Sequence, residues 1–270
     1  HVVCRRQRQM CIRDRTNPGA EEARKGFESL TIPEDRFLLV SIFGGSIEEF
    51  VEVAKILAPV ADGLELNLSC PHAQGYGMAM GQDPEMVKAI VSAVKAAVDV
   101  PVIPKLTPNV DRIEDIGLAA LEAGADGLCA INTVGPGYTE SHGHPVLSNG
   151  MGGMSGSGVL PTALKCIRAL KTITDKPIIG CGGLSTADDC RAAISAGASI
   201  IGVGSALSGM NTEDMNAYFR QLQTDLDKGT NKVKAGLNLD LDMDFATYEV
   251  VANDPCLLYT SDAADDIPRV

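Results

Sequence analysis

The chain has 270 residues, of which 45% are hydrophobic, and its 23 basic and 35 acidic residues give a formal net charge of -12. This acidic balance argues against a nucleic-acid-binding surface and against attraction to anionic membranes. No apolar run approaches the ~18 residues that a membrane-spanning helix needs.

Both ends of the chain are expected to be foreign to the protein. Residues 1–15 (HVVCRRQRQMCIRDR) and 256–270 (CLLYTSDAADDIPRV) have neither helical nor strand periodicity. A DNA segment that encodes the first gives the second as its reverse complement in a shifted frame, and it resembles a sequencing adapter. Both ends are therefore excluded from fold reasoning. Removing their six arginines and four aspartates leaves 17 basic and 31 acidic residues, a net charge of -14.

Between these ends, short apolar runs alternate with amphipathic stretches, as expected for buried strands connected by helices. The predicted strands are 37–43, 63–68, 101–106, 127–132, 177–181 and 199–203. The predicted helices are 21–30, 47–57, 83–98, 111–123, 160–173, 186–196 and 212–227. Two helix-to-strand joints have nearly the same sequence, Glu-Ala-Gly-Ala-Asp ending at Asp126 and Ser-Ala-Gly-Ala-Ser ending at Ser199, with a glycine placed to end the helix.

This alternation predicts a parallel α/β sheet, either doubly wound or closed into a barrel. The G-x-G-x-x-G fingerprint of doubly wound dinucleotide-binding sheets is missing after the first strand. Glycines follow the last two strands instead, where barrels bind phosphate after strands seven and eight. Counting back makes 37–43 the third strand. We therefore predict an N-terminally truncated (β/α)8 TIM barrel with about six of its eight strands present.

The expected domain organisation has four parts. Residues 1–15 and 256–270 are adapter-derived, 16–228 form the incomplete barrel, and 229–255 form an extension of unknown role.

Polar residues gather where the predicted strands end, which is where barrels have their active sites. Asn67 and Cys70 follow one strand, Lys105 ends another, and Asn132-Thr133 end a third. Each has an ordinary explanation alone, because asparagine can cap a turn and lysine can be solvated. Together, asparagines can hold a planar ligand with donors and acceptors, and lysine can place positive charge where a ligand gains electrons. Backbone amides of the nearby glycine turns can hold a phosphate.

The cysteines indicate a reducing compartment. Five remain between the two ends, an odd number without C-x-x-C spacing, which argues against structural zinc. Cys129, Cys166 and Cys190 lie in apolar or helical contexts, so we expect them to be buried packing residues.

Five motifs, in this order, resemble the dihydroorotate dehydrogenase family: Asn-Leu-Ser-Cys-Pro-His at 67–72, Pro-Lys-Leu-Thr-Pro-Asn at 104–109, Ile-Asn-Thr-Val at 131–134, Gly-Gly-Met-Ser-Gly at 152–156 and Ile-Ile-Gly-Cys-Gly-Gly at 178–183. The resemblance runs from about Asn17 to Leu207. The flavin domain of dihydropyrimidine dehydrogenase is similar in the same motifs and tends to share a histidine at the position of His72. The segment 134–149 is more similar to the dihydroorotate enzymes.

The resemblance implies FMN at the barrel mouth, with contacts from Lys105, Gly156, Gly182, Gly183, Gly204 and Ser205. It implies that a pyrimidine is held by Asn17, Asn67, Asn132 and Thr133. Cys70 would be the general base that removes a proton from C5 of dihydroorotate while hydride leaves C6.

The implied activity is oxidation of dihydroorotate to orotate in pyrimidine biosynthesis. The alternatives are reduction of uracil or thymine on the same scaffold, and a non-catalytic phosphate-binding barrel. Cysteine as the base is typical of the soluble class, so a cytoplasmic enzyme is expected. A homo-oligomer is expected as well. An iron–sulfur and FAD electron-transfer subunit is a candidate partner, and no metal, nucleic acid or membrane is expected to bind.

Overall fold

The computed structural model describes residues 19–68, 80–138, 140–141, 144–145 and 151–234. The two ends predicted to be adapter-derived lie outside the described residues, as do 235–255 of the predicted extension. Within the described part, none of the helices is long and apolar enough to cross a membrane.

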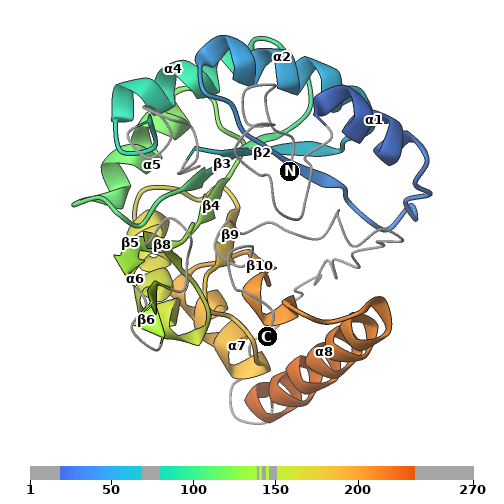
Figure 1. Ribbon diagram of the computed structural model, residues 1–270. Helices are drawn as coiled ribbons and strands as arrows, with labels where there is room; N and C mark the ends of the chain where they lie inside the picture. The colour runs from blue at the N-terminus through green and yellow to red at the C-terminus, as the bar shows by residue number, and fades with distance from the viewer. Residues whose placement is uncertain (1–18, 69–79, 139, 142–143, 146–150, 235–270) are drawn as a thin grey trace.

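Six strands form one parallel sheet in the order β1-β2-β3-β4-β9-β10, so each strand lies beside the next one added to this sheet along the chain. The strands are β1 (Leu39–Ile42), β2 (Gly63–Asn67), β3 (Val102–Leu106), β4 (Leu128–Ala130), β9 (Ile178–Cys181) and β10 (Ile200–Gly202). Each lies inside a predicted range. The sheet curls, with helices around its outer side, which confirms a fold of the α/β barrel type (Figure 1).

The helices also follow the prediction closely. They are α1 (Ala20–Glu28), α2 (Ile47–Leu57), α4 (Pro84–Lys95), α5 (Ile113–Glu122), α6 (Leu160–Lys171), α7 (Ala187–Ala196) and α8 (Thr212–Lys234). Short 3-10 turns lie at η2 (Ala58–Val60), η3 (Ser157–Val159) and η4 (Ser205–Leu207). Helix α8 continues past 228, the predicted end of the barrel segment.

The two similar helix-to-strand joints end their helices in the predicted way. Gly124 follows α5 with φ of 96°, and Gly197 follows α7 with φ of 116°. Both angles lie in the left-handed region, which a residue with a Cβ enters only with strain. The chain therefore reverses sharply after each helix and enters the next strand.

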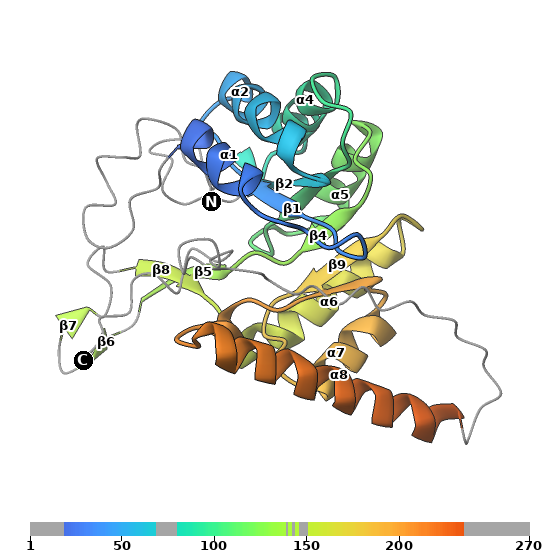
Figure 2. The same cartoon turned by 90° about the vertical axis from the view of Figure 1, so that its right-hand side faces the viewer.

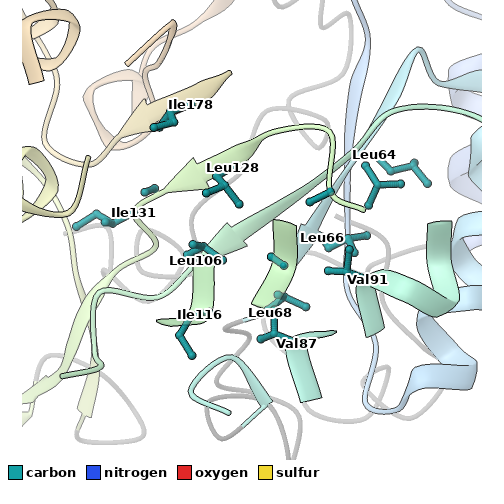
Figure 3. Packing of buried hydrophobic residues seen from close by; sticks show 14 of the residues in the cluster. Leu64, Leu66, Leu68, Val87, Val91, Leu106, Ile116, Leu128, Ile131 and Ile178 are labelled. Atoms are coloured by element: carbon teal, nitrogen blue, oxygen red, sulfur yellow. The ribbon is translucent and has the colours of Figure 1, made fainter. Parts of the chain in front are cut away.

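The main hydrophobic core lies between the sheet and its helices. On β2, Leu64 and Leu66 are fully buried, and Figure 3 shows them beside Val91 of α4. Leu68, just after the strand, lies near Val87 in the same view. Side chains alternate between the two faces of a strand, so the residues between these leucines face the inside of the curl.

After β4 the structure has short strands that are not among the predicted ones. Strands β5 (Val134–Tyr138) and β8 (Met151–Met154) pair antiparallel, and β6 (Glu140–Ser141) pairs with β7 (His144–Pro145). Figure 2 shows β5 and β8 projecting beyond the sheet. The segment is rich in glycine and has no apolar alternation, so its sequence lacks the usual strand signal.

Candidate active site

The inner face of β2 and β3 carries a layer of polar side chains. The Cα of Asn67 on β2 pairs with that of Lys105 on β3, and Lys105 pairs in turn with Cys129 on β4. All three are buried, with residual exposures of 3%, 7% and 1%. Residues paired in register on neighbouring strands face the same side of a sheet. The structure thus brings the predicted Asn67 and Lys105 into one row.

The two predicted asparagines are joined directly. Asn132, just after β4, donates from Nδ2 to Oδ1 of Asn67 at 2.9 Å. Its own Oδ1 accepts the backbone N–H of Thr133 at 2.8 Å, and its backbone N–H donates to Leu106 O at 2.9 Å. These bonds fix the orientation of the Asn132 carboxamide. Because a carboxamide has both donors and acceptors, this pair is suited to a planar polar ligand.

Asn109 holds the chain that leads into Thr133 and β5. Its Nδ2 donates to Thr133 O at 3.1 Å and to Oγ1 of Thr107 at 3.1 Å, and its Oδ1 accepts the backbone N–H of Gly135 at 2.8 Å. Asn109 belongs to one of the family motifs, but no role was predicted for it. Its position after β3, beside other strand ends, was the available signal.

The predicted phosphate-binding residues also meet. Ser205, after β10, accepts the backbone N–H of Gly156 on its Oγ at 3.1 Å. Gly182 and Gly183, after β9, have φ of 111° and 79°. A Cβ added to Gly183 would lie 2.8 Å from Gly156 O and 2.8 Å from the backbone N of Leu160. Three loops therefore approach one another so closely that only glycine fits at 183.

The start of α6 adds a second feature to this glycine cradle, defined here as Gly156, Gly182, Gly183 and Ser205. The helix begins at Leu160, and its N-cap residue Val159 makes no side-chain capping hydrogen bond. By contrast, Thr186 and Asp189 close the start of α7 with a reciprocal capping box. Backbone N–H groups at a helix start attract anions. The cradle therefore fits a phosphate group; Gly204 lies beside it, immediately before Ser205.

A charge pair lies deeper inside the curl. Lys105 Nζ lies 3.6 Å from Oε1 of Glu65, and each side chain is only 9% exposed. Ser41 of β1 donates its hydroxyl to the same Oε1 at 2.8 Å. Neither Glu65 nor Ser41 is among the predicted site residues. Glu65 comes two residues before Asn67 on the same strand face, so the period of two residues could have identified it.

Two thiols lie next to this charge pair. Cys129 Sγ and Cys181 Sγ are 3.6 Å apart, and Cys181 also donates to Ile131 O at 3.2 Å. The hydrogen bond from Cys129, together with the Lys105 charge, lowers the pKa of the Cys181 thiol. The same bond and burial raise the pKa of Cys129. The three cysteines predicted to be packing residues, Cys129, Cys166 and Cys190, are all buried, as expected.

Two predicted site residues cannot be compared with this geometry. Asn17 and Cys70 lie outside the described residues, as does His72. Their assignments remain predictions from sequence.

Known proteins provide an independent comparison. The sequence model of the family described as dihydroorotate dehydrogenase matches residues 16–226. The catalytic subunit of dihydroorotate dehydrogenase B (NAD(+)) from Thermococcus kodakarensis is 53% identical over 172 residues, covering 63% of this chain and 57% of that protein. The protein of the same name from Pyrococcus abyssi is 50% identical over 196 residues, covering 71% of this chain and 64% of that protein.

The chain thus spans about three fifths of the length of these relatives. Among solved structures, that of DHODH in complex with ferulenol from Eimeria tenella has a TM-score of 0.62 at 21% identity. It covers 82% of this chain and 65% of the other, and at this identity it supports the fold alone.

Proposed function

Since the chain belongs to the dihydroorotate dehydrogenase family, we propose that it provides the active-site wall of an enzyme that oxidises dihydroorotate to orotate with FMN. The observation that supports this most directly is that the candidate binding groups lie at one edge of the sheet. A buried carboxamide pair, Asn67 and Asn132, lies beside the buried Lys105 at the strand ends from which the glycine loops also leave the sheet. These are the groups needed to hold a pyrimidine, an electron-accepting ring and a phosphate.

The substrate is recognised by amide groups in this proposal. A dihydropyrimidine ring presents alternating carbonyl and N–H groups, and carboxamides can match both. Asn67, Asn132 and Thr133 bind that edge of the ring, and Asn17 completes the set. The bond from Thr133 N–H to Asn132 Oδ1 keeps one carboxamide from rotating, so less freedom is lost on binding.

The glycine cradle holds the cofactor phosphate in this proposal. Gly183 and the start of α6 present backbone N–H groups, while Ser205 keeps the Gly156 loop in position by accepting the Gly156 N–H. Lys105 supplies positive charge beside the ring. When bound, FMN supplies the electron acceptor for the oxidation.

Cys70 is the proposed general base. It follows Asn67 by three residues in the sequence, and it removes a proton from C5 of dihydroorotate. A free thiol has a pKa of about 8.5, so proton removal is favoured under mildly alkaline conditions. This assignment rests on the motif alone.

We also propose a cytoplasmic protein that works with an electron-transfer subunit. Two relatives are named as catalytic subunits of an NAD(+)-linked dehydrogenase, and such a name implies a further subunit in those proteins. The resemblance to the soluble class and the reducing compartment indicated by the cysteines support the location.

The test compares substrates in the longest reading frame that contains this chain. The purified protein is expected to bind FMN, and the flavin absorbance should bleach when dihydroorotate is added without oxygen. Uracil with a reduced flavin is the matched reverse assay, because His72 is shared with the dihydropyrimidine enzymes. Turnover of uracil with no response to dihydroorotate would reassign the substrate, and a protein without any flavin would support a non-catalytic barrel.

A further inference from the structure

The buried carboxylate of Glu65 lies beside Lys105, and the proposed function assigns it no direct role. Glu65 is 7% exposed, its Oε1 lies 3.6 Å from Lys105 Nζ, and the same oxygen accepts the Ser41 hydroxyl at 2.8 Å. The three residues come from three adjacent strands, β1, β2 and β3. They form a chain across the inner face of the sheet.

The fold itself does not require these three linked polar side chains. Barrel interiors are dominated by bulky branched residues such as valine, isoleucine and leucine. A buried ion pair is often no more stabilising than apolar residues of the same volume, because both charges lose their hydration. A charge pair kept at such a position is therefore better explained by what it does to one of its members.

We propose that Glu65, held by Ser41, is a positioning residue that keeps the Lys105 side chain charged and fixed in the row of Asn67. Burial of an ammonium group without a partner favours loss of its proton, and a nearby carboxylate opposes that loss. The Ser41 hydroxyl fixes the carboxylate oxygen nearest to Lys105. This inference rests on the proposed function, in which Lys105 supplies positive charge beside the cofactor.

Other titratable groups face Lys105 from neighbouring strands. Cys129 on β4 and Cys181 on β9 both interact electrostatically with Lys105 and with Glu65. A thiolate at Cys181 would add a second negative neighbour at high pH. Among the described residues of this group, Glu65 is the carboxylate. Its replacement therefore tests whether the carboxylate charge keeps Lys105 protonated.

The first experiment reads the Lys105 proton directly and needs no cofactor. The chain is labelled with 13C-lysine, the Cε signal of Lys105 is assigned by its loss in Lys105→Met, and the signal is followed by NMR from pH 6 to 11. Glu65→Gln keeps the side-chain shape and removes the charge. We expect the Lys105 proton affinity to fall at least ~10-fold in this variant.

Two further variants show whether a change in the Lys105 titration is specific to the Glu65 carboxylate. Glu65→Asp retains a carboxylate and should restore most of the proton affinity. Asp126→Asn breaks a different lysine–carboxylate pair, in which Lys95 Nζ lies 2.8 Å from Asp126, and should leave the Lys105 titration unchanged. An unchanged Lys105 titration in Glu65→Gln would overturn the proposal. If that variant does not fold, Ser41→Ala must move the Lys105 signal, and no movement would overturn it.

The second experiment uses the FMN-loaded protein and measures the flavin midpoint potential against pH. In Glu65→Gln the curve should bend at the pH where NMR shows Lys105 losing its proton, with a lower potential above that pH. Wild type and Asp126→Asn should lack this bend, and coincident curves for all three would overturn the role of Glu65. A protein that binds no FMN would refute the proposed function instead, while the NMR result would still decide the pairing.

Discussion

Gly183→Ala tests the glycine cradle most sharply, because the structure separates two costs of this change. The backbone at Gly183 has φ of 79°, where an L side chain is strained by about 1–2 kcal/mol. The added Cβ would also lie 2.8 Å from both Gly156 O and Leu160 N. Crowding of a packed site costs about 1–3 kcal/mol. We therefore expect a loss of about 2–5 kcal/mol in the free energy of unfolding.

Gly209→Ala is the matched control for strain alone. Its φ is 81°, nearly that of Gly183, and a Cβ there would meet no atom within 4 Å. Urea denaturation should show only the ~1–2 kcal/mol strain cost in this variant. The difference between the two variants measures the crowding against Gly156 and Leu160.

The same pair of variants tests where the phosphate binds. Relief of the contact at Gly183 must shift Gly183, the Gly156 loop or the start of α6, and the backbone N–H groups of Gly183 and of the α6 start are the proposed phosphate donors. Loss of one hydrogen bond to a charged group costs about 1.5–3 kcal/mol, or roughly a 10–100-fold weaker FMN affinity. Flavin fluorescence titration measures this affinity. Equal FMN affinity in Gly183→Ala, Gly209→Ala and wild type would show that the phosphate binds elsewhere.

Three further changes have defined outcomes. Asn132→Leu leaves Asn67 without the 2.9 Å bond, so urea denaturation should show a loss of about 1–3 kcal/mol, and orotate binding should weaken; an unchanged orotate affinity would contradict the carboxamide pair. Cys70→Ala should retain FMN while stopped-flow reduction by dihydroorotate slows ~10²–10⁴-fold, and near-normal rates would end the general-base assignment. Burial raises the pKa of Cys190 from 9.0 to about 11, so the folded state holds this proton more tightly than the unfolded state. Its stabilising contribution is complete below pH 9 and lost as the pH rises towards 11, so Cys190→Ala should show a shallower fall in stability over this window, and identical slopes would refute the linkage.

The sequence by itself determined the helices and the six strands of the main sheet, together with their order. Strand and helix ranges follow from apolar periodicity, which is a property of neighbouring residues and needs no tertiary information. The turns at Gly124 and Gly197 follow from local chemistry as well, because glycine enters left-handed backbone without a Cβ penalty. Strand ends therefore fixed in advance which polar residues would share one edge, including Asn67, Lys105 and Asn132.

Only the tertiary structure decided which of these residues touch. Asn67 and Asn132 are 65 residues apart in sequence, and the Gly156–Ser205 bond spans 49. Such contacts depend on the register and curl of the sheet, which bring side chains from different strands to one level. Glu65 was overlooked for the same reason. From the sequence alone, a glutamate in a strand is expected to face solvent. The curl of the sheet instead places this face of β2 on the inside, where a buried carboxylate needs a partner such as Lys105.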